Sequence, residues 1–332
     1  MITLIEYDCN KDQTTTTYHR CTFVRGVCYI VIVSEKASKV SGKIRHNIRD
    51  LSEDVHCLGD NTEVKVVMVD DSDQRDWLAA ACICPLLAQH QIAHTGIMSA
   101  ESGLEVIRTD QSGSYFMACI DGEGEVLFNG GWRKLRPGHA CLLPPFVQNA
   151  LRSVPGKSWS FVWVRYVESR DVVPIATSRS PVQGKFNDVS LKAAVEGLYA
   201  ECQSSNTPSA LSQWTELIHQ YVLKFAQPEH SDDRLWKLWT KIEQHLEYPW
   251  TLAELADAAF MSPEHLRRLC KKELGRSPIQ HLTFLRMKHA RHLLATTEDK
   301  VEVIARAVGY ESPFTFSNTF KKWVGWRPSE LR

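Results

Sequence analysis

The last hundred residues of the chain contain an internal repeat. Ser262-Pro263 opens a stretch that ends in Lys271-Lys272-x-x-Gly275-x-x-Pro278, and Ser312-Pro313 opens a second stretch in which Lys321, Lys322, Gly325 and Pro328 follow at identical spacing. In each copy a Ser-Pro pair suits the start of a helix and a glycine suits its end. Apolar residues recur at helical spacing upstream of both copies. Each copy therefore predicts two short helices joined by a few residues, which is a helix-turn-helix unit.

A longer helical pattern separates the two units, from about Pro278 to Thr296. At about 1.5 Å per residue such a helix spans about 28 Å. This length would hold two helices in successive major-groove segments of one DNA duplex.

The charge distribution agrees with this interpretation. The whole chain has zero formal net charge, but residues 234–332 contain 17 Lys and Arg against 11 Asp and Glu. A basic module beside an acidic remainder is typical of a nucleic-acid-binding domain attached to another domain, although a solvated basic surface also explains it.

The segments TLAELADAAFMSPEHLRRLCKKELGRSP, RMKHARHLLATT and VEVIARAVGYESPFTFSNTFKKWVGWRPSELR resemble the DNA-binding domain of the AraC/XylS family of bacterial regulators. The resemblance implies a sequence-specific transcription regulator bound to double-stranded DNA, with activation, and hence RNA polymerase as a partner, the usual outcome. It also implies two groups of DNA-contacting residues. Those expected at base edges are Glu264, His265, Arg267, Arg268, Pro313, Phe314, Thr315 and Asn318. Those expected at phosphates are Ser262, Lys271, Lys272, Ser312, Lys321 and Lys322.

The middle of the chain changes to short alternating runs separated by turn residues, from Tyr115 to Val167, which predicts antiparallel strands. Asn129-Gly130 predicts a two-residue hairpin, and Arg136-Pro137-Gly138 a second tight turn. The segment DGEGEVLFNGGWRKLRPGHACLLPP resembles the cupin-like barrel that precedes the DNA-binding domain in many AraC-type regulators, which implies a small effector, often a sugar.

Two other functions remain open for this barrel. A metal-dependent cupin enzyme needs clustered His and carboxylate ligands, and the segment lacks an H-x-H motif. We therefore expect no metal, no cofactor and no catalytic residue. A barrel that binds no ligand and serves only for dimerisation is the second alternative.

Candidate effector contacts follow from alternation and from the resemblance. Phe161, Trp163 and Arg165 share one face of a predicted strand, and aromatic side chains with a few polar groups suit a small polar ligand. Asp121 and Asn149 stand near positions where relatives place polar contacts. Packing in the core is the competing explanation for the aromatic residues.

The predicted organisation is multidomain α+β. An N-terminal extension covers residues 1–90, a cupin-like antiparallel β-barrel 91–170, a helical dimerisation or linker region 171–230, and an all-α domain with two helix-turn-helix units joined by a long helix 231–332. Helices are expected from about Asn187 to Gln203 and from Ser209 to Ala226, with a hinge at Gln227 to Asp233. We expect a homodimer.

Composition and the N-terminal sequence indicate where the protein is located and how its cysteines are used. The longest apolar run, near Cys28 to Val33, is too short to span a bilayer, and the N-terminus lacks a secretory pattern. We therefore expect a cytoplasmic protein without a membrane partner. The ten cysteines include a lone C-x-C at Cys82 and Cys84, so free thiols are expected rather than a zinc site.

Overall fold

The computed structural model describes residues 21–24, 27–30, 55–59, 61–109, 112–169, 172–227 and 233–331. Contacts divide the chain into two units, residues 1–49 and 50–332. In the first unit β1 (Cys21–Val24) pairs antiparallel with β2 (Val27–Ile30). The expected hinge at 227–233 lies largely outside the described residues, as does most of the segment before residue 55. None of the described helices combines the length and apolarity needed to cross a bilayer.

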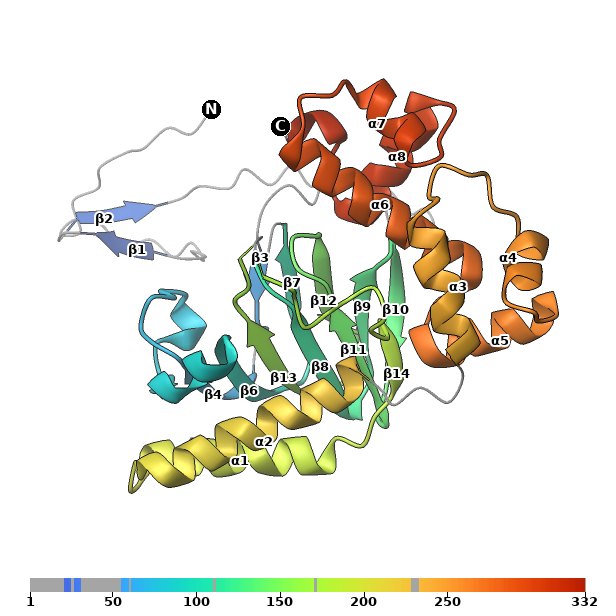
Figure 1. Ribbon diagram of the computed structural model, residues 1–332. Coiled ribbons are helices and arrows are strands. Elements are labelled where there is room, and N and C mark those ends of the chain that lie inside the picture. The colour runs from blue at the N-terminus through green and yellow to red at the C-terminus, as the bar shows by residue number, and fades with distance from the viewer. Residues whose placement is uncertain are drawn as a thin grey trace. The chain divides into compact units, whose positions relative to one another are not determined.

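Two sheets form the β-domain of the second unit (Figure 1). The larger sheet has the strand order β14 (Gln183–Lys185), β11 (His139–Leu143), β8 (Tyr115–Gly122), β13 (Trp159–Tyr166), β6 (Ile92–Ala100), β4 (Glu63–Met68) and β5 (Cys82–Ile83). The smaller sheet has the order β10 (Gly131–Leu135), β9 (Gly124–Phe128), β12 (Asn149–Ser153), β7 (Glu105–Arg108) and β3 (Val55–Cys57). Short 3-10 helices, η1 (Asp76–Leu78) and η2 (Pro85–His90), flank β5.

These sheets correct two predictions. In the second unit the described strands form two separate sheets, so the expected barrel is not closed. In addition β4 pairs with β6, and β3 pairs with β7, so strands before residue 91 belong to the β-domain and the expected boundary lies too late. The segments 55–59 and 61–90 are therefore part of the β-domain, and the expected N-terminal extension is shorter than residues 1–90.

The two predicted turns are confirmed. Asn129 and Gly130, between β9 and β10, have φ of 53° and 70°, the left-handed pair that a tight two-residue hairpin needs. Gly138 has φ of 78°, and the N–H of His139 donates to the carbonyl of Arg136 at 3.1 Å.

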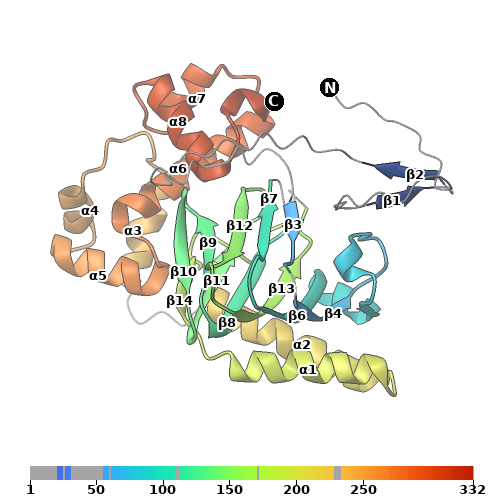
Figure 2. The ribbon, with the colours of Figure 1, turned by 180° about the vertical axis from the view of Figure 1, so that it is seen from behind.

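The larger sheet is buried on both faces. One face and the smaller sheet share a core that includes Met117, Val126, Leu151, Phe161 and Trp163. Against the other face pack α1 (Val189–Gln203) and α2 (Pro208–Ala226), which lie side by side in both views (Figures 1 and 2). Burial on both sides explains why the central strands are nearly continuous runs of apolar residues.

The C-terminal helices form two small cores that share one long helix. The first core combines α3 (Asp233–Glu243), α4 (Leu252–Ala258), α5 (Pro263–Leu274) and the start of α6 (Pro278–Thr296). The second combines the end of α6 with α7 (Val301–Ala307) and α8 (Pro313–Val324). The long helix has the bounds that the sequence predicts, and the fold is the expected all-α domain with two helix-turn-helix units.

Candidate functional site

The second helix of each helix-turn-helix unit begins and ends in the same way. Ser262 and Ser312 are the N-caps of α5 and α8, and their hydroxyl oxygens accept from the N–H groups of His265 (3.2 Å) and Thr315 (3.3 Å). Gly275 and Gly325 end the helices in the left-handed conformation, with φ of 69° and 100°. The repeat in the sequence is therefore a repeat of helix boundaries.

The exposed face of α5 carries the predicted base contacts. Glu264, Arg267 and Arg268 are exposed, and His265 is half-buried. Within the described residues their side-chain partners lie on this helix: the Arg267 guanidinium is 3.4 Å from the Glu264 carboxylate, and Arg268 Nη2 is 3.3 Å from His265 Nδ1. These side chains leave a polar surface that can exchange its contacts for base edges.

The corresponding face of α8 is less polar. Phe314 is 76% exposed, Thr315 and Asn318 are exposed, and Pro313 is half-buried. The exposed Phe ring and the Thr methyl group can make apolar contacts with the methyl groups of thymine, which would remove them from water.

The predicted phosphate-contacting lysines lie in the last turn of each helix. Lys271, Lys272, Lys321 and Lys322 are all exposed. Lys271 Nζ donates to the Gly275 carbonyl at 3.1 Å, and Lys272 pairs with Glu273 at 3.0 Å. A cation at this position also stabilises the helix dipole, so the lysines have a structural role in addition to the predicted one.

A row of polar side chains crosses the larger sheet at one end. Arg165 on β13 pairs in register with His94 on β6 and with Tyr115 on β8, so the three side chains share a face. Tyr115 belongs to the core between the sheets, so the row faces the smaller sheet. From that sheet Arg108 reaches across, with its guanidinium carbon 4.3 Å from the centre of the Tyr115 ring and Nη1 donating to Asn149 Oδ1 at 3.4 Å.

The segment after β4 adds three residues to this end. Trp77 packs edge-on against His94 (5.9 Å) and Trp163 (6.0 Å), measured between ring centres. The Arg75 guanidinium lies over the Trp77 ring at 5.2 Å and is paired with the Asp73 carboxylate. We call Arg75, Trp77, His94, Arg108, Tyr115 and Arg165 the polar cluster.

Burial and like charges govern the electrostatics of the polar cluster. Burial, together with the charges of Arg75 and Arg108, lowers the pKa of Arg165 to about 10, against an ordinary value of 12.5. Burial and the neighbouring arginines hold the pKa of His94 well below its ordinary value, so this imidazole is neutral. The Trp163 Nε1–H donates to His94 Nδ1 at 2.8 Å, which places the imidazole hydrogen on Nε2.

Three of the five predicted effector contacts lie at this end, and two do not. Trp163 and Arg165 border the polar cluster or belong to it, and Asn149 accepts from Arg108. Phe161 is buried deeper in the core, where its ring is in tilted contact with the rings of Trp159 and Trp163. Asp121 pairs with Ser160, five residues along β13 from Arg165, so it lies about 16 Å away.

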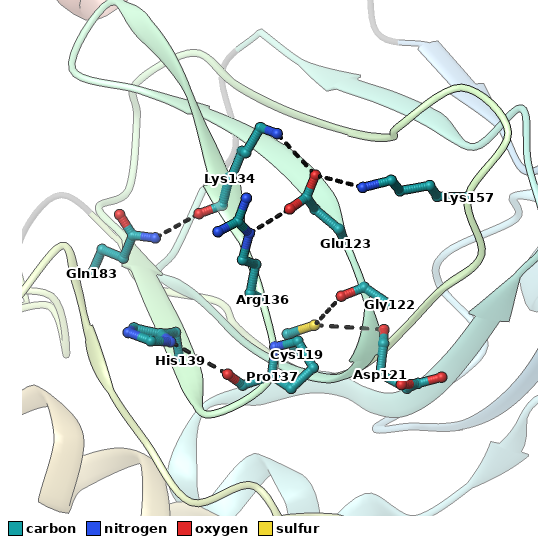
Figure 3. A network of polar contacts seen from close by, with 10 residues as sticks. All are labelled: Cys119, Asp121, Gly122, Glu123, Lys134, Arg136, Pro137, His139, Lys157 and Gln183. Carbon is teal, nitrogen blue, oxygen red and sulfur yellow. Dashed lines mark hydrogen bonds and ion pairs between the residues drawn. The ribbon is translucent and has the colours of Figure 1, made fainter.

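Asp121 instead lies beside a second group of charges (Figure 3). Its side chain is exposed, and its carbonyl accepts from the Cys119 thiol at 3.6 Å. The nearby Glu123 carboxylate contacts Lys134 (3.0 Å), Lys157 (3.2 Å) and Arg136. Hydrogen bonds from Lys134 and Arg136 lower the pKa of Glu123 to about 2. Because these ion pairs satisfy the carboxylate, we assign this group a role in holding the hairpins together.

Sequence reasoning missed His94, Arg75, Trp77, Arg108 and Tyr115. Two of them had a visible signal, since His94 interrupts the apolar run IAHTGIM and Arg108 ends the run EVIR. Tyr115 is brought to the site by strand pairing, and Arg75 and Trp77 by the segment after β4 that contains η1. No group of three or more His, Cys, Asp or Glu in the described residues is arranged to hold a metal ion.

Two family models match the chain. One, described as an AraC-like ligand binding domain, matches residues 104–238, and one described as a helix-turn-helix domain matches residues 255–332. The first match spans strands of both sheets, α1 and α2, and the second spans both repeat copies. The chain belongs to the AraC/XylS family.

The chain is also similar to individual known proteins. The chain is 31% identical over 116 residues to a protein of Bacillus subtilis named "Uncharacterized HTH-type transcriptional regulator YisR", covering 35% of this chain and 40% of that protein. It is 26% identical over 231 residues to the arabinose operon regulatory protein of Salmonella typhimurium, covering 64% and 81%. The solved C-terminal domain of AraT from Geobacillus stearothermophilus is 35% identical, covering 31% of this chain and 87% of that chain, with a TM-score of 0.30.

The first of these relatives is matched over less than half of its own length.

Proposed function

We propose that this family member is a sequence-specific DNA-binding transcription regulator whose β-domain binds a small effector. The observation that carries the proposal is the pair of capped helices α5 and α8, which present different exposed faces at the two ends of one rigid helix. Glu264, Arg267 and Arg268 on α5 supply acceptor and donor groups for cytosine and guanine edges, and Phe314, Thr315 and Asn318 on α8 supply groups for thymine and adenine. A single copy would then recognise a site made of two unequal halves.

The test selects binding sites for the full-length chain from random duplex DNA and footprints the enriched sequence. We expect two protected segments about one helical turn apart, within one gently bent or straight duplex. Enrichment without any shared sequence, or a footprint of a single short segment, would contradict the bipartite site.

The remaining partners belong to the same proposal. A regulator that activates transcription would also contact RNA polymerase, and a homodimer would bring two such DNA-binding domains together. Leu211, Ile218 and Val222 of α2 are buried within the β-domain core, whereas Leu217 is 40% exposed. A dimer seam on α2 would therefore centre on Leu217, and the molar mass of Leu217→Asp in solution, compared with the unaltered chain, tests this seam.

A further inference from the structure

The polar cluster contains hydrogen-bond donors on Arg165, His94 and Trp77 that have no partner within the described residues. The Arg165 guanidinium makes no hydrogen bond or ion pair within the described part of the chain, although it is largely withdrawn from solvent. His94 is 1% exposed, and its Nε2, which carries the ring hydrogen, has no partner; the same is true of the buried Nε1–H of Trp77. Buried donors left without acceptors destabilise the fold, so such groups indicate a missing partner.

The acceptors of this end of the β-domain are already occupied. Asp73 receives the Arg75 guanidinium, with Nε to Oδ1 at 2.7 Å. His56 Nε2 accepts from Arg75 Nη1 at 3.2 Å, and Asn149 Oδ1 accepts from Arg108. A neutral sugar must donate as well as accept, and it would find few free acceptors here. A ligand that only accepts fits the unused groups.

Charge leads to the same class of ligand. Among the described residues, the charged groups that act on Arg165 are two like charges, Arg75 and Arg108, and one opposite charge, Asp73. Because Asp73 is paired with Arg75, the guanidinium of Arg165 keeps its positive charge in a partly buried place, which is unfavourable unless an anion joins it. A guanidinium and a carboxylate form a paired, two-point hydrogen bond that suits both requirements.

The surroundings of the donors indicate an organic anion rather than an inorganic one. Trp77 and Trp163 lie against His94, and their rings present apolar surface beside the unused N–H groups. Trp77, Arg75 and Arg165 are each partly exposed, so the cluster is in contact with solvent.

We propose that the polar cluster binds a small organic carboxylate, with the Arg165 guanidinium holding the carboxylate oxygens and the His94 and Trp77 ring N–H groups donating to acceptor atoms of the ligand. This inference rests on the proposed function, because it names the chemical class of the effector. Such a ligand differs in charge from the sugar that the resemblance implies as a frequent effector.

The test measures the thermal stability of the full-length chain with matched pairs of compounds at equal ionic strength. The acids are acetate, phenylacetate, succinate and galacturonate, and their neutral counterparts are acetamide, phenylacetamide, succinamide and galactose, with inorganic phosphate as a further arm. We expect one or more carboxylates to raise Tm by several degrees and their neutral counterparts to leave it unchanged, since a ligand stabilises the state that it binds. Stabilisation by galactose or the amides, by phosphate alone, or by none of the acids overturns the proposal.

Arg165→Gln supplies the second measurement. We expect it to weaken carboxylate binding at least about tenfold and to raise the Tm of the ligand-free chain, because it removes one of three clustered like charges. Arg133→Gln, an exposed arginine on β10, is the matched control and should change neither quantity. If Arg165→Gln lowers the ligand-free Tm and leaves carboxylate binding intact, the arginine has a structural role and the proposal fails.

DNA binding is measured separately on the selected site. Arg165→Gln should retain ligand-free DNA binding, because Arg165 lies in the β-domain. If the unaltered chain binds the selected DNA site specifically but binds none of the carboxylates, the ligand class alone is refuted. Carboxylate binding without any sequence-specific DNA binding would refute the proposed regulator and leave the ligand site standing.

Discussion

Arg268 and Lys272 lie one helical turn apart on the exposed face of α5, and they are expected to contact different parts of DNA. Arg268→Ala should cost about 1 to 3 kcal/mol on the selected site and relax the preference at one base pair, because a guanidinium pairs with two atoms of guanine. Binding to a set of single-base variants of the site, measured by fluorescence anisotropy, checks this result.

Lys272→Ala is the matched control for that experiment. It should weaken binding to all variants by a similar factor and reduce the slope of log K against log salt by about one, as expected when one phosphate contact is lost. An Arg268→Ala variant with the same uniform loss and reduced slope would show that Arg268 contacts phosphate.

Glu123 makes stability depend on pH in a defined range. The pKa of its carboxyl is about 2 in the folded chain, against an ordinary value of 4.5, because Lys134, Arg136 and Lys157 surround it. A lowered folded-state pKa contributes stability that is complete above about pH 5 and is lost as the pH falls through 4.5 toward 2. Glu123→Gln should therefore be less stable than the unaltered chain at pH 7, and this difference should shrink steadily below pH 4.5.

Urea midpoints of both proteins between pH 7 and pH 2.5 test this expectation. The control is Arg133→Gln, which alters a cation of the same hairpin that has no ion pair with Glu123. Its urea midpoint should differ from that of the unaltered chain by the same amount at every pH in this range. A gap between the Glu123→Gln variant and the unaltered chain that stays constant or widens toward acid would contradict the assignment.

Residue types alone locate part of the candidate site. Arg165 and Trp163 are recognisable because they alternate on one strand, and the DNA-contacting residues because they recur at fixed places in a repeat. His94, Tyr115 and Arg165 are far apart in the sequence and become neighbours only through the register of β6, β13 and β8. Register depends on the whole sheet, so no local pattern predicts this row.

At the scale of elements, the crossing of α1 and α2 depends on one small residue. A Cβ on Gly197 would lie 2.7 Å from the Trp214 ring, which is closer than such atoms approach. Gly197→Ala gains about 1 kcal/mol of helix propensity but incurs about 1 to 3 kcal/mol of overpacking. We expect a net loss of about 1 kcal/mol in the free energy of unfolding, measured by urea denaturation.

The double variant Gly197→Ala/Trp214→Leu separates these two effects. With the indole removed, the alanine should be neutral or stabilising relative to Trp214→Leu alone. If Gly197→Ala is equally harmful in both backgrounds, the indole is not the cause.

The helices were more predictable than the strands for a physical reason. Helix boundaries in the C-terminal domain are local, since the capping box of Thr251 and Glu254 and the Ser-Pro starts at 262, 277 and 312 lie within a few residues of the groups that they satisfy. Strand β4 was not assigned to the β-domain from the sequence, because burial on both faces obscures the alternation that indicates a strand.

At the scale of the whole molecule, α6 fixes the angle between the two DNA-contacting helices. One extra residue in a helix turns everything after it by about 100°. Inserting a single Ala after the exposed Lys288 should therefore turn α7 and α8 away from the face shared with α5. Footprinting should then show one protected half of the selected site, with lower affinity.

Lys288→Ala, which changes the same position without changing the helix length, is the control and should keep both protected halves. Full protection of both halves by the insertion variant would show that the two units bind independently of the geometry of α6.

The shared long helix also has a consequence for how the chain is made. The buried residues of the first helical core lie between Leu235 and Leu285, and those of the second lie between Met287 and Val324. Each core is therefore complete within a short stretch of sequence. Contacts that are local in sequence form early and quickly. During synthesis the first core has all its residues before the second has been translated, and half of the newly finished α6 is then the surface on which the second core assembles.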